Sequence, residues 1–142
     1  FDPDMYEYTS TESLVSCTNN AVKALLDAGH KAEDIAVLSW RGMATSAIVG
    51  ADAIAGIATR RFSGQYSDQG EPIITAGDLL LDTIHRFKGQ SADCVVLTEL
   101  DFDEWTVDNC RRLFVGLTRA RLKVSLVASS RACREIEKRL AG

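Results

Sequence analysis

Two short segments in the second half of the sequence carry side chains that could bind phosphate groups. The first, residues 82–90, places a hydroxyl, an imidazole and an amine within six residues, on Thr83, His85 and Lys88. They follow an apolar segment and precede Gly89, where the backbone can turn sharply and approach a ligand closely. Such donors suit phosphate oxygens, but an ordinary polar loop with a partly buried histidine would have the same composition.

The second segment, residues 111–121, is rich in arginine. A helix over 107–120 is expected to pack one apolar face against a sheet, through Val107, Cys110, Phe114 and Leu117. Arg112 and Arg119 would then share the opposite side, because seven residues are almost two helical turns. A guanidinium group is permanently charged and suits a phosphate oxygen or the charge that develops in phosphoryl transfer. By spacing alone, a solvated helix face is the commoner explanation.

The elements that would position these segments alternate between helical and strand-like patterns. Apolar residues recur every three or four positions from Ser10 to Gly29, and Ser10 or Thr11 could cap that helix. This alternation predicts an α/β domain with a mostly parallel central sheet flanked by helices. Residues 62–72, rich in glycine and small polar residues, are expected to form an exposed, mobile loop. The expected helices are 10–29, 43–57, 107–120 and 131–140, and the expected strands are 35–40, 79–84, 94–100 and 123–128.

Length and composition indicate one folded, soluble domain over residues 1–142. Hydrophobic residues make up 46% and no apolar run approaches the roughly 18 residues that span a bilayer. The four cysteines contain no Cys-x-x-Cys pair, which favours free thiols in a reducing, cytoplasmic setting. The net charge of −4 means that any site for a polyanion must be local. The chain starts at Phe1 without a signal sequence, and we expect it to be a piece of a longer protein.

Together the two segments resemble motifs V and VI of the UvrD/Rep family of superfamily 1 helicases. Motif V corresponds to Thr83-Ile-His-Arg-Phe-Lys-Gly89, and motif VI to Arg111-Arg-Leu-Phe-Val-Gly-Leu-Thr-Arg-Ala120. The segment from Asp34 to Arg41 is a weaker match to an earlier strand of the same domain. The resemblance implies the second, C-terminal RecA-like motor domain of an ATP-dependent DNA helicase.

The resemblance also implies roles for individual residues. Arg119 would be the catalytic arginine finger that reaches the γ-phosphate of ATP. Thr83, His85 and Arg41 would contact single-stranded DNA. The nucleotide-binding residues would be Lys88, Gly89, Ser91, Arg112 and Arg119. ATP and Mg²⁺ would bind between this domain and an N-terminal RecA-like domain of the same protein, and no metal site is expected here.

The sequence departs from the family pattern at several points. Ser91 stands where the family usually has Glu, and the phosphate-binding Gly-x-x-x-x-Gly-Lys-Ser/Thr loop is missing. The interval between Arg41 and Thr83 is short, so an accessory domain inserted there would be reduced or absent. Isolated, the chain should not hydrolyse ATP. Two alternatives remain: a degenerate helicase-like domain that serves as a protein-interaction scaffold, and an unrelated α/β binding module.

Overall fold

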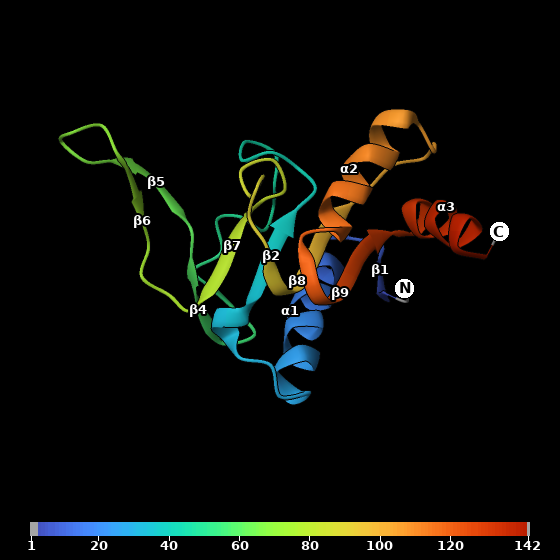
Figure 1. The fold of residues 1–142 in the computed structure, drawn as a ribbon, viewed down its shortest axis with the longest axis horizontal. Helices are drawn as coiled ribbons and strands as arrows, with labels where there is room; N and C mark the ends of the chain where they lie inside the picture. The colour runs from blue at the N-terminus through green and yellow to red at the C-terminus, as the bar shows by residue number, and fades with distance from the viewer. Residues whose placement is uncertain (1–2, 142) are drawn as a thin grey trace.

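The computed structural model describes residues 3–141 as a curled, mostly parallel sheet flanked by three helices (Figure 1). The strands of the sheet lie in the order β1-β9-β8-β2-β7-β4-β3, and only the β3–β4 pair is antiparallel. The α/β prediction is therefore confirmed. The strands of this sheet are β1 (Asp4–Tyr8), β2 (Ile35–Ser39), β3 (Ala53–Ile54), β4 (Ile57–Arg60), β7 (Leu79–Thr83), β8 (Ala92–Leu100) and β9 (Ala120–Ser129).

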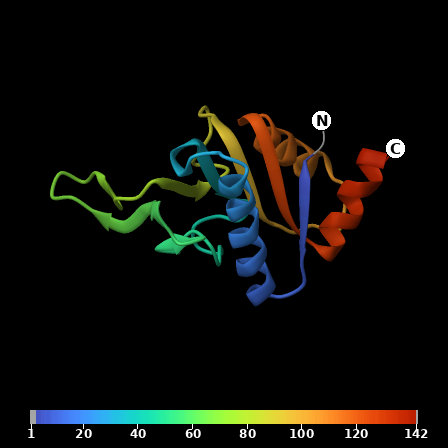
Figure 2. The same ribbon diagram turned by 90° about the horizontal axis from the view of Figure 1, so that it is seen from below.

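The helices cover opposite faces of the sheet (Figure 2). Helix α1 (Thr11–Asp27) packs on one face, where its Val22 and Leu25 join Val37 and Val96 in one apolar core. Helices α2 (Val107–Leu117) and α3 (Ser130–Ala141) lie on the other face, over a second core. The central strands β2 and β8 are buried on both sides, because each face carries its own helix layer.

The ends of α1 follow the expected signals. The hydroxyl of Ser10 accepts a hydrogen bond from the backbone N–H of Ser13, which completes a capping box. Gly29, just beyond the helix, has φ +99°, a conformation that side-chain-bearing residues rarely adopt. The predictions of this helix and of the strand that follows it are thus confirmed.

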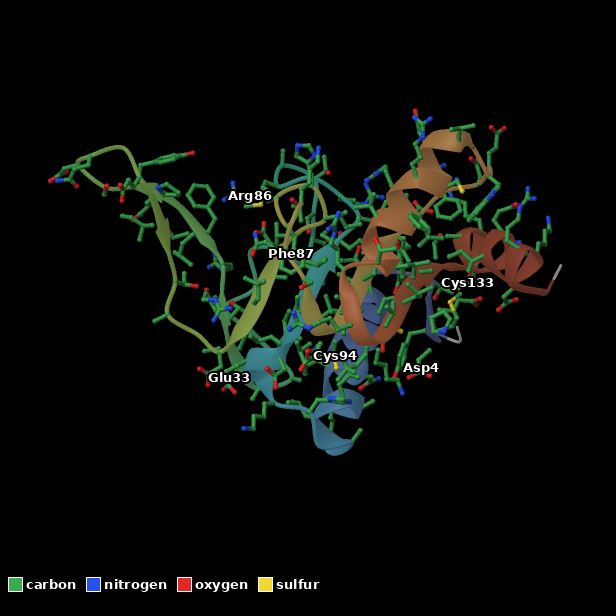
Figure 3. All side chains as sticks on the ribbon, viewed as in Figure 1. Asp4, Glu33, Arg86, Phe87, Cys94 and Cys133 are labelled. Carbon is green, nitrogen blue, oxygen red and sulfur yellow. The ribbon has the colours of Figure 1, made fainter. Side chains whose placement is uncertain are left out.

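The four cysteines are free thiols, as predicted. Cys94 and Cys133 are buried, and burial raises the pKa of the Cys133 thiol to about 11 (Figure 3).

The predicted helix over 43–57 is wrong. This stretch forms turns followed by β3, β4 and a tight connection between them. Ala55 and Gly56, the two residues of that connection, have φ of +52° and +78°. Such values at both central positions suit a two-residue hairpin turn and are incompatible with an α-helix. The helix prediction relied on the alanine-rich composition of this stretch. In the structure, turn geometry and strand pairing outweigh the helix propensity of alanine.

An exposed loop was expected over residues 62–72, and the structure has a hairpin over 62–74. Strand β5 (Phe62–Tyr66) pairs antiparallel with β6 (Pro72–Ile74), and this hairpin projects from the main sheet (Figure 1). Gly64 and Gly70 both have positive φ, at an irregularity in the pairing and at the turn. The glycines thus shape a hairpin rather than an open loop. Its exposure is as expected, and its mobility stays a prediction.

The face that α2 turns to the core differs from the one expected. Its fully buried residues are Leu113 and Gly116, whereas Val107, Cys110 and Phe114 are exposed. A Cβ atom added at Gly116 would lie 2.8 Å from Cδ2 of Leu97, so the helix approaches β8 closely at this glycine. The close approach of the glycine decides the orientation, and the more hydrophobic stripe is left at the surface. No strand was predicted at β1, which pairs with β9 at the edge of the sheet.

Candidate functional site

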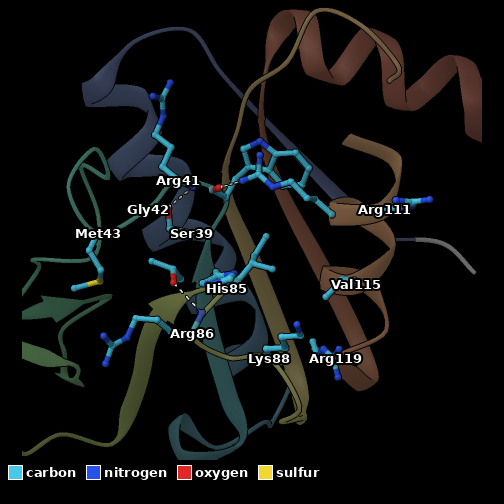
Figure 4. A pocket seen from close by; sticks show the side chains of 14 residues that line it. Ser39, Arg41, Gly42, Met43, His85, Arg86, Lys88, Arg111, Val115 and Arg119 are labelled. Carbon is cyan, nitrogen blue, oxygen red and sulfur yellow. Dashed lines mark hydrogen bonds between the residues drawn. The ribbon is translucent and has the colours of Figure 1, made fainter. Parts of the chain in front are cut away.

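A cleft of about 600 Å³ lies where β2 and β7 end, beside helix α2 (Figure 4). Because these strands are parallel, their carboxyl ends meet at one edge of the sheet, the usual position of ligand sites in α/β folds. The loops that follow the two strands form one wall, and α2 with the residues after it forms the other. The lining residues are Ser39, Trp40, Arg41, Gly42, Met43, Thr83, Ile84, His85, Arg86, Lys88, Arg111, Arg112, Val115 and Arg119.

The cleft is strongly cationic although the chain as a whole is acidic. Six of its lining residues are Arg or Lys, and none of the described lining residues is Asp or Glu. The net charge of the chain is −4, so the positive charge is concentrated at this edge of the sheet. Such a concentration attracts anions locally without making the whole surface attractive to them. The expectation of a local site is consistent with this charge distribution.

The loop after β7 turns back on Thr83. The Thr83 hydroxyl accepts a hydrogen bond from the backbone N–H of Arg86 (3.1 Å), and its carbonyl accepts one from Phe87 (3.1 Å). Phe87 is buried and anchors the loop, while His85 and Lys88 are exposed and line the cleft. The alternation of apolar and polar residues in this segment thus has a structural explanation, since the buried Phe87 holds the loop and the polar residues on either side of it line the cleft.

Arg119 lies just beyond the end of α2. Its carbonyl accepts a hydrogen bond from the backbone N–H of Ala92 (3.0 Å), which joins this segment to the start of β8. In the described part of the chain, its side chain makes no hydrogen bond or ion pair, and its Nε atom is buried without a partner. Lys88 likewise has no side-chain partner there, and Figure 4 shows both cations at the same end of the cleft. An anion placed between them would satisfy both groups.

Arg112 also lines the cleft, but its guanidinium group is engaged by Trp40. The guanidinium carbon lies 4.1 Å from the centroid of the Trp40 ring, and Nη2 donates a hydrogen bond to the Trp40 carbonyl. Burial lowers the pKa of this guanidinium. Arg112 therefore links α2 to the segment after β2, an arrangement that fixes the distance between the two walls of the cleft.

Arg41 is held at the rim of the cleft by Asp101. The two side chains form an ion pair of 3.5 Å, and the same carboxylate accepts two hydrogen bonds from Arg131 (2.7 and 3.0 Å) and one from Ser129 (2.7 Å). The hydrogen bond from Arg131 is the main cause that holds the pKa of Asp101 below its usual value. Asp101 is therefore expected to remain ionised at neutral pH and to orient Arg41.

Two of the predicted residues lie outside the cleft lining. Gly89 has φ +83°, as the sharp turn requires, but it does not line the cleft. Ser91 does not line it either, and its hydroxyl accepts a hydrogen bond from Nη1 of Arg121 (2.9 Å). The same arginine pairs with Asp93. The structure thus brings together Arg41, Thr83, His85, Lys88, Arg112 and Arg119, and places Gly89 and Ser91 beyond them.

Sequence reasoning missed a buried network behind the cleft. The Glu99 carboxylate is almost fully buried and accepts hydrogen bonds from the hydroxyls of Ser39 and Ser46 and from the backbone N–H of Ala47. The Ser39 hydroxyl in turn accepts from the backbone N–H of Arg41 (3.0 Å). Glu99 therefore ties the loop after β2 to the central strand β8. The sequence feature that could have indicated this network is Glu99, an acidic residue near the end of an apolar strand.

Residues 78–127 match the family model described as the UvrD-like helicase C-terminal domain. Over this range the chain is similar to that family. The matched range contains both basic segments and strand β8 between them. The mostly parallel sheet of the chain, with its flanking helices, is consistent with the RecA-like fold that the resemblance implied. No curated protein matches the chain.

Two further observations concern the described residues as a group. Residues 3–141 contain no cluster of three His, Cys, Asp or Glu that could hold a metal ion. None of their helices combines the length and apolar character that crossing a bilayer would need.

Proposed function

We propose that the chain is the C-terminal motor domain of an ATP-dependent DNA helicase or translocase. It would supply an arginine finger and contacts to single-stranded DNA, while the phosphate-binding loop comes from an N-terminal RecA-like domain of the same protein. The observation that carries the proposal is a pair of cations, Arg119 and Lys88, whose side chains have no partner among the described residues and which lie in a cationic cleft of a UvrD-like segment.

The proposed chemistry follows from the positions of these groups. The residues fit a polyphosphate, because the buried Nε of Arg119 has no partner among the described residues and an anionic oxygen would provide one. ATP with Mg²⁺ would supply the phosphoryl group that is transferred to water. Arg119 would stabilise the charge that develops on that group, and Lys88 would bind an adjacent oxygen. The metal ligands would come from the other motor domain.

The DNA side of the cleft would be formed by Thr83, His85 and Arg41. His85 and Arg41 are exposed at the cleft, whereas Thr83 is almost fully buried and its hydroxyl oxygen accepts a hydrogen bond from the backbone N–H of Arg86. Closure of the two motor domains on ATP would move these residues along the strand. Weak, salt-sensitive binding of DNA to this chain alone is expected, since affinity of this kind depends on neutralised phosphates.

The decisive experiment compares Arg119→Ala with Arg121→Ala in the longer protein that contains both motor domains. Arg119→Ala should lower DNA-stimulated ATPase activity by about 10³-fold or more, the range typical of arginine fingers, with little effect on folding. Arg121 lies two residues away, outside the cleft, where it pairs with Asp93 and Ser91, so its loss should leave turnover nearly unchanged. Near-normal turnover of the Arg119 variant would refute the assignment.

The second candidate is a degenerate, non-catalytic helicase-like domain that binds a protein partner. Ser91 favours it, because the family usually has a glutamate near the nucleotide at this position and here the hydroxyl is engaged by Arg121. A longer protein without measurable ATP hydrolysis, and without ATP binding in equilibrium dialysis, would favour this candidate over the motor domain.

A further inference from the structure

The hairpin of β5 and β6 leaves an aromatic face uncovered next to the cationic cleft. Phe62 and Tyr66 contact each other with ring centroids 5.4 Å apart, and Tyr66 is 63% exposed. In the register of the hairpin, Ile74 lies opposite Phe62 and Pro72 opposite Tyr66. Directly paired residues point to the same side of an antiparallel ribbon, and so do Pro72 and Ile74, which are two residues apart on β6. Together with the contact between the Phe62 and Tyr66 rings, this places the four side chains on one apolar face.

The aromatic face is continuous with the cleft through Arg86. The guanidinium carbon of Arg86 lies 5.1 Å from the centroid of the Phe62 ring, and Arg86 is one of the residues that line the cleft. Its Nε atom also pairs with Asp82 (3.2 Å), which fixes the side chain between the cleft and the hairpin. Figure 3 shows Arg86 on the side of the β7 loop that faces the hairpin. The cationic lining of the cleft therefore lies directly beside the half-buried ring of Phe62, which in turn contacts the exposed ring of Tyr66.

We propose that this hairpin is a stacking platform for the bases of a single DNA strand whose phosphates lie in the cleft. The inference rests on the proposed function, because the strand is the one that the cleft would hold. Sites for single strands combine a cationic track for the backbone with aromatic rings on which bases stack, and they tolerate any sequence because every base has a π-face. Tyr66 would be the main stacking residue, since its ring is the more exposed of the two.

The charges of the hairpin agree with bases, rather than phosphates, as its contact. Asp68 and Glu71 lie in and beside the turn, where they repel a phosphate backbone. The backbone is therefore kept on the side of Arg86 and the cleft, and uncharged bases are the part of the strand that can reach Tyr66. A two-stranded hairpin is marginally stable by itself in water, so covering its apolar face also stabilises it.

The test measures binding of the 142-residue chain to two fluorescent oligomers of equal length and charge, oligothymidine and an abasic oligomer, by anisotropy at low salt. The chain should bind oligothymidine about fivefold or more tightly than the abasic oligomer, as expected for one stacked base. Tyr66→Ala should remove this difference and leave the affinity for the abasic oligomer unchanged. Tyr66→Phe keeps the ring and should retain the difference.

Ile73→Ala is the matched control, because Ile73 is exposed on the same hairpin but lies between residues of the aromatic face and so points to the other side. It should behave like the unaltered chain. Equal affinity for both oligomers, or a difference that survives Tyr66→Ala, would overturn the platform while leaving the proposed cleft function intact. Failure of both oligomers to bind would remove the platform and the proposed DNA contacts together.

Discussion

Replacement of Glu99 tests whether the buried network determines the shape of the loop that lines the cleft. In Glu99→Ala, the backbone N–H of Ala47 and the hydroxyls of Ser39 and Ser46 lose their acceptor. The backbone N–H of Ala47 loses a hydrogen bond to a carboxylate, a type of bond worth about 1.5–3 kcal/mol, and each hydroxyl loses one that it can only partly replace. Removal of the carboxylate also removes the cost of burying it. A loss of about 3 kcal/mol in the free energy of unfolding follows, a large part of the 5–15 kcal/mol typical of domains.

The backbone at Glu99 provides an internal check on that magnitude. Its φ is +63°, a conformation that costs a residue with a Cβ atom about 1–2 kcal/mol relative to glycine. Glu99→Gly loses the same hydrogen bonds as Glu99→Ala but relieves this strain. It should therefore be the more stable of the two by about 1 kcal/mol, in spite of the greater flexibility of glycine in the unfolded chain.

Urea unfolding followed by circular dichroism measures both effects. With a slope of about 2 kcal/mol per molar urea, Glu99→Ala should lower the midpoint by about 1.5 M without changing the slope. A midpoint within about 0.25 M of the unaltered chain would refute the view that this carboxylate holds the loop. An alanine variant more stable than the glycine variant would show that the backbone strain is unimportant.

Two further predictions concern packing and pH. A Cβ atom at Gly77 would lie 2.4 Å from the carbonyl carbon and oxygen of Thr59. Gly77→Ala should therefore destabilise the chain by about 1–3 kcal/mol in the same urea assay. The control is Gly50→Ala, where the added atom meets nothing within 4 Å, and it should be nearly neutral. Asp101 has a folded pKa below its ordinary 3.8, so its contribution to stability is present above that value and is lost as the pH falls through the folded pKa. The difference in melting temperature between the unaltered chain and Asp101→Asn should accordingly be greatest near neutral pH and shrink as the pH falls below 3.8. A difference that stays constant through this fall in pH would contradict the explanation.

Much of the fold was predictable because hydrophobic patterning specifies buried strands. The uninterrupted apolar segments at 35–40 and 94–100 became the central strands β2 and β8, and the capped, periodic segment from Ser10 became α1. The alanine-rich stretch 43–57 was mispredicted, since its apolar residues are buried by turns and strand pairing rather than by one helical face. Composition alone does not distinguish these two ways of burying the same residues.

The cleft was predictable in its residue types and less so in their partners. The two basic segments were expected to act together, and parallel strands do bring their ends to one edge. The sequence gives no sign that the Arg112 guanidinium stacks on Trp40, seventy-two residues away, or that Arg121 engages Ser91. Contacts of this kind depend on distances across the fold that local pattern does not contain.

Residue chemistry and strand pattern are local properties, so the amino-acid sequence was enough to predict which residues could bind phosphate and that they follow strands of a parallel sheet. How the cations are used depends on contacts across the fold. Among the described residues, the side chains of Lys88 and Arg119 have no partner, Arg112 stacks on Trp40, and the aromatic hairpin lies beside Arg86. The physical reason is that each charged group takes the partner that packing brings within reach. Which partner that is depends on helix orientation and strand order, as the close approach of Gly116 to β8 illustrates.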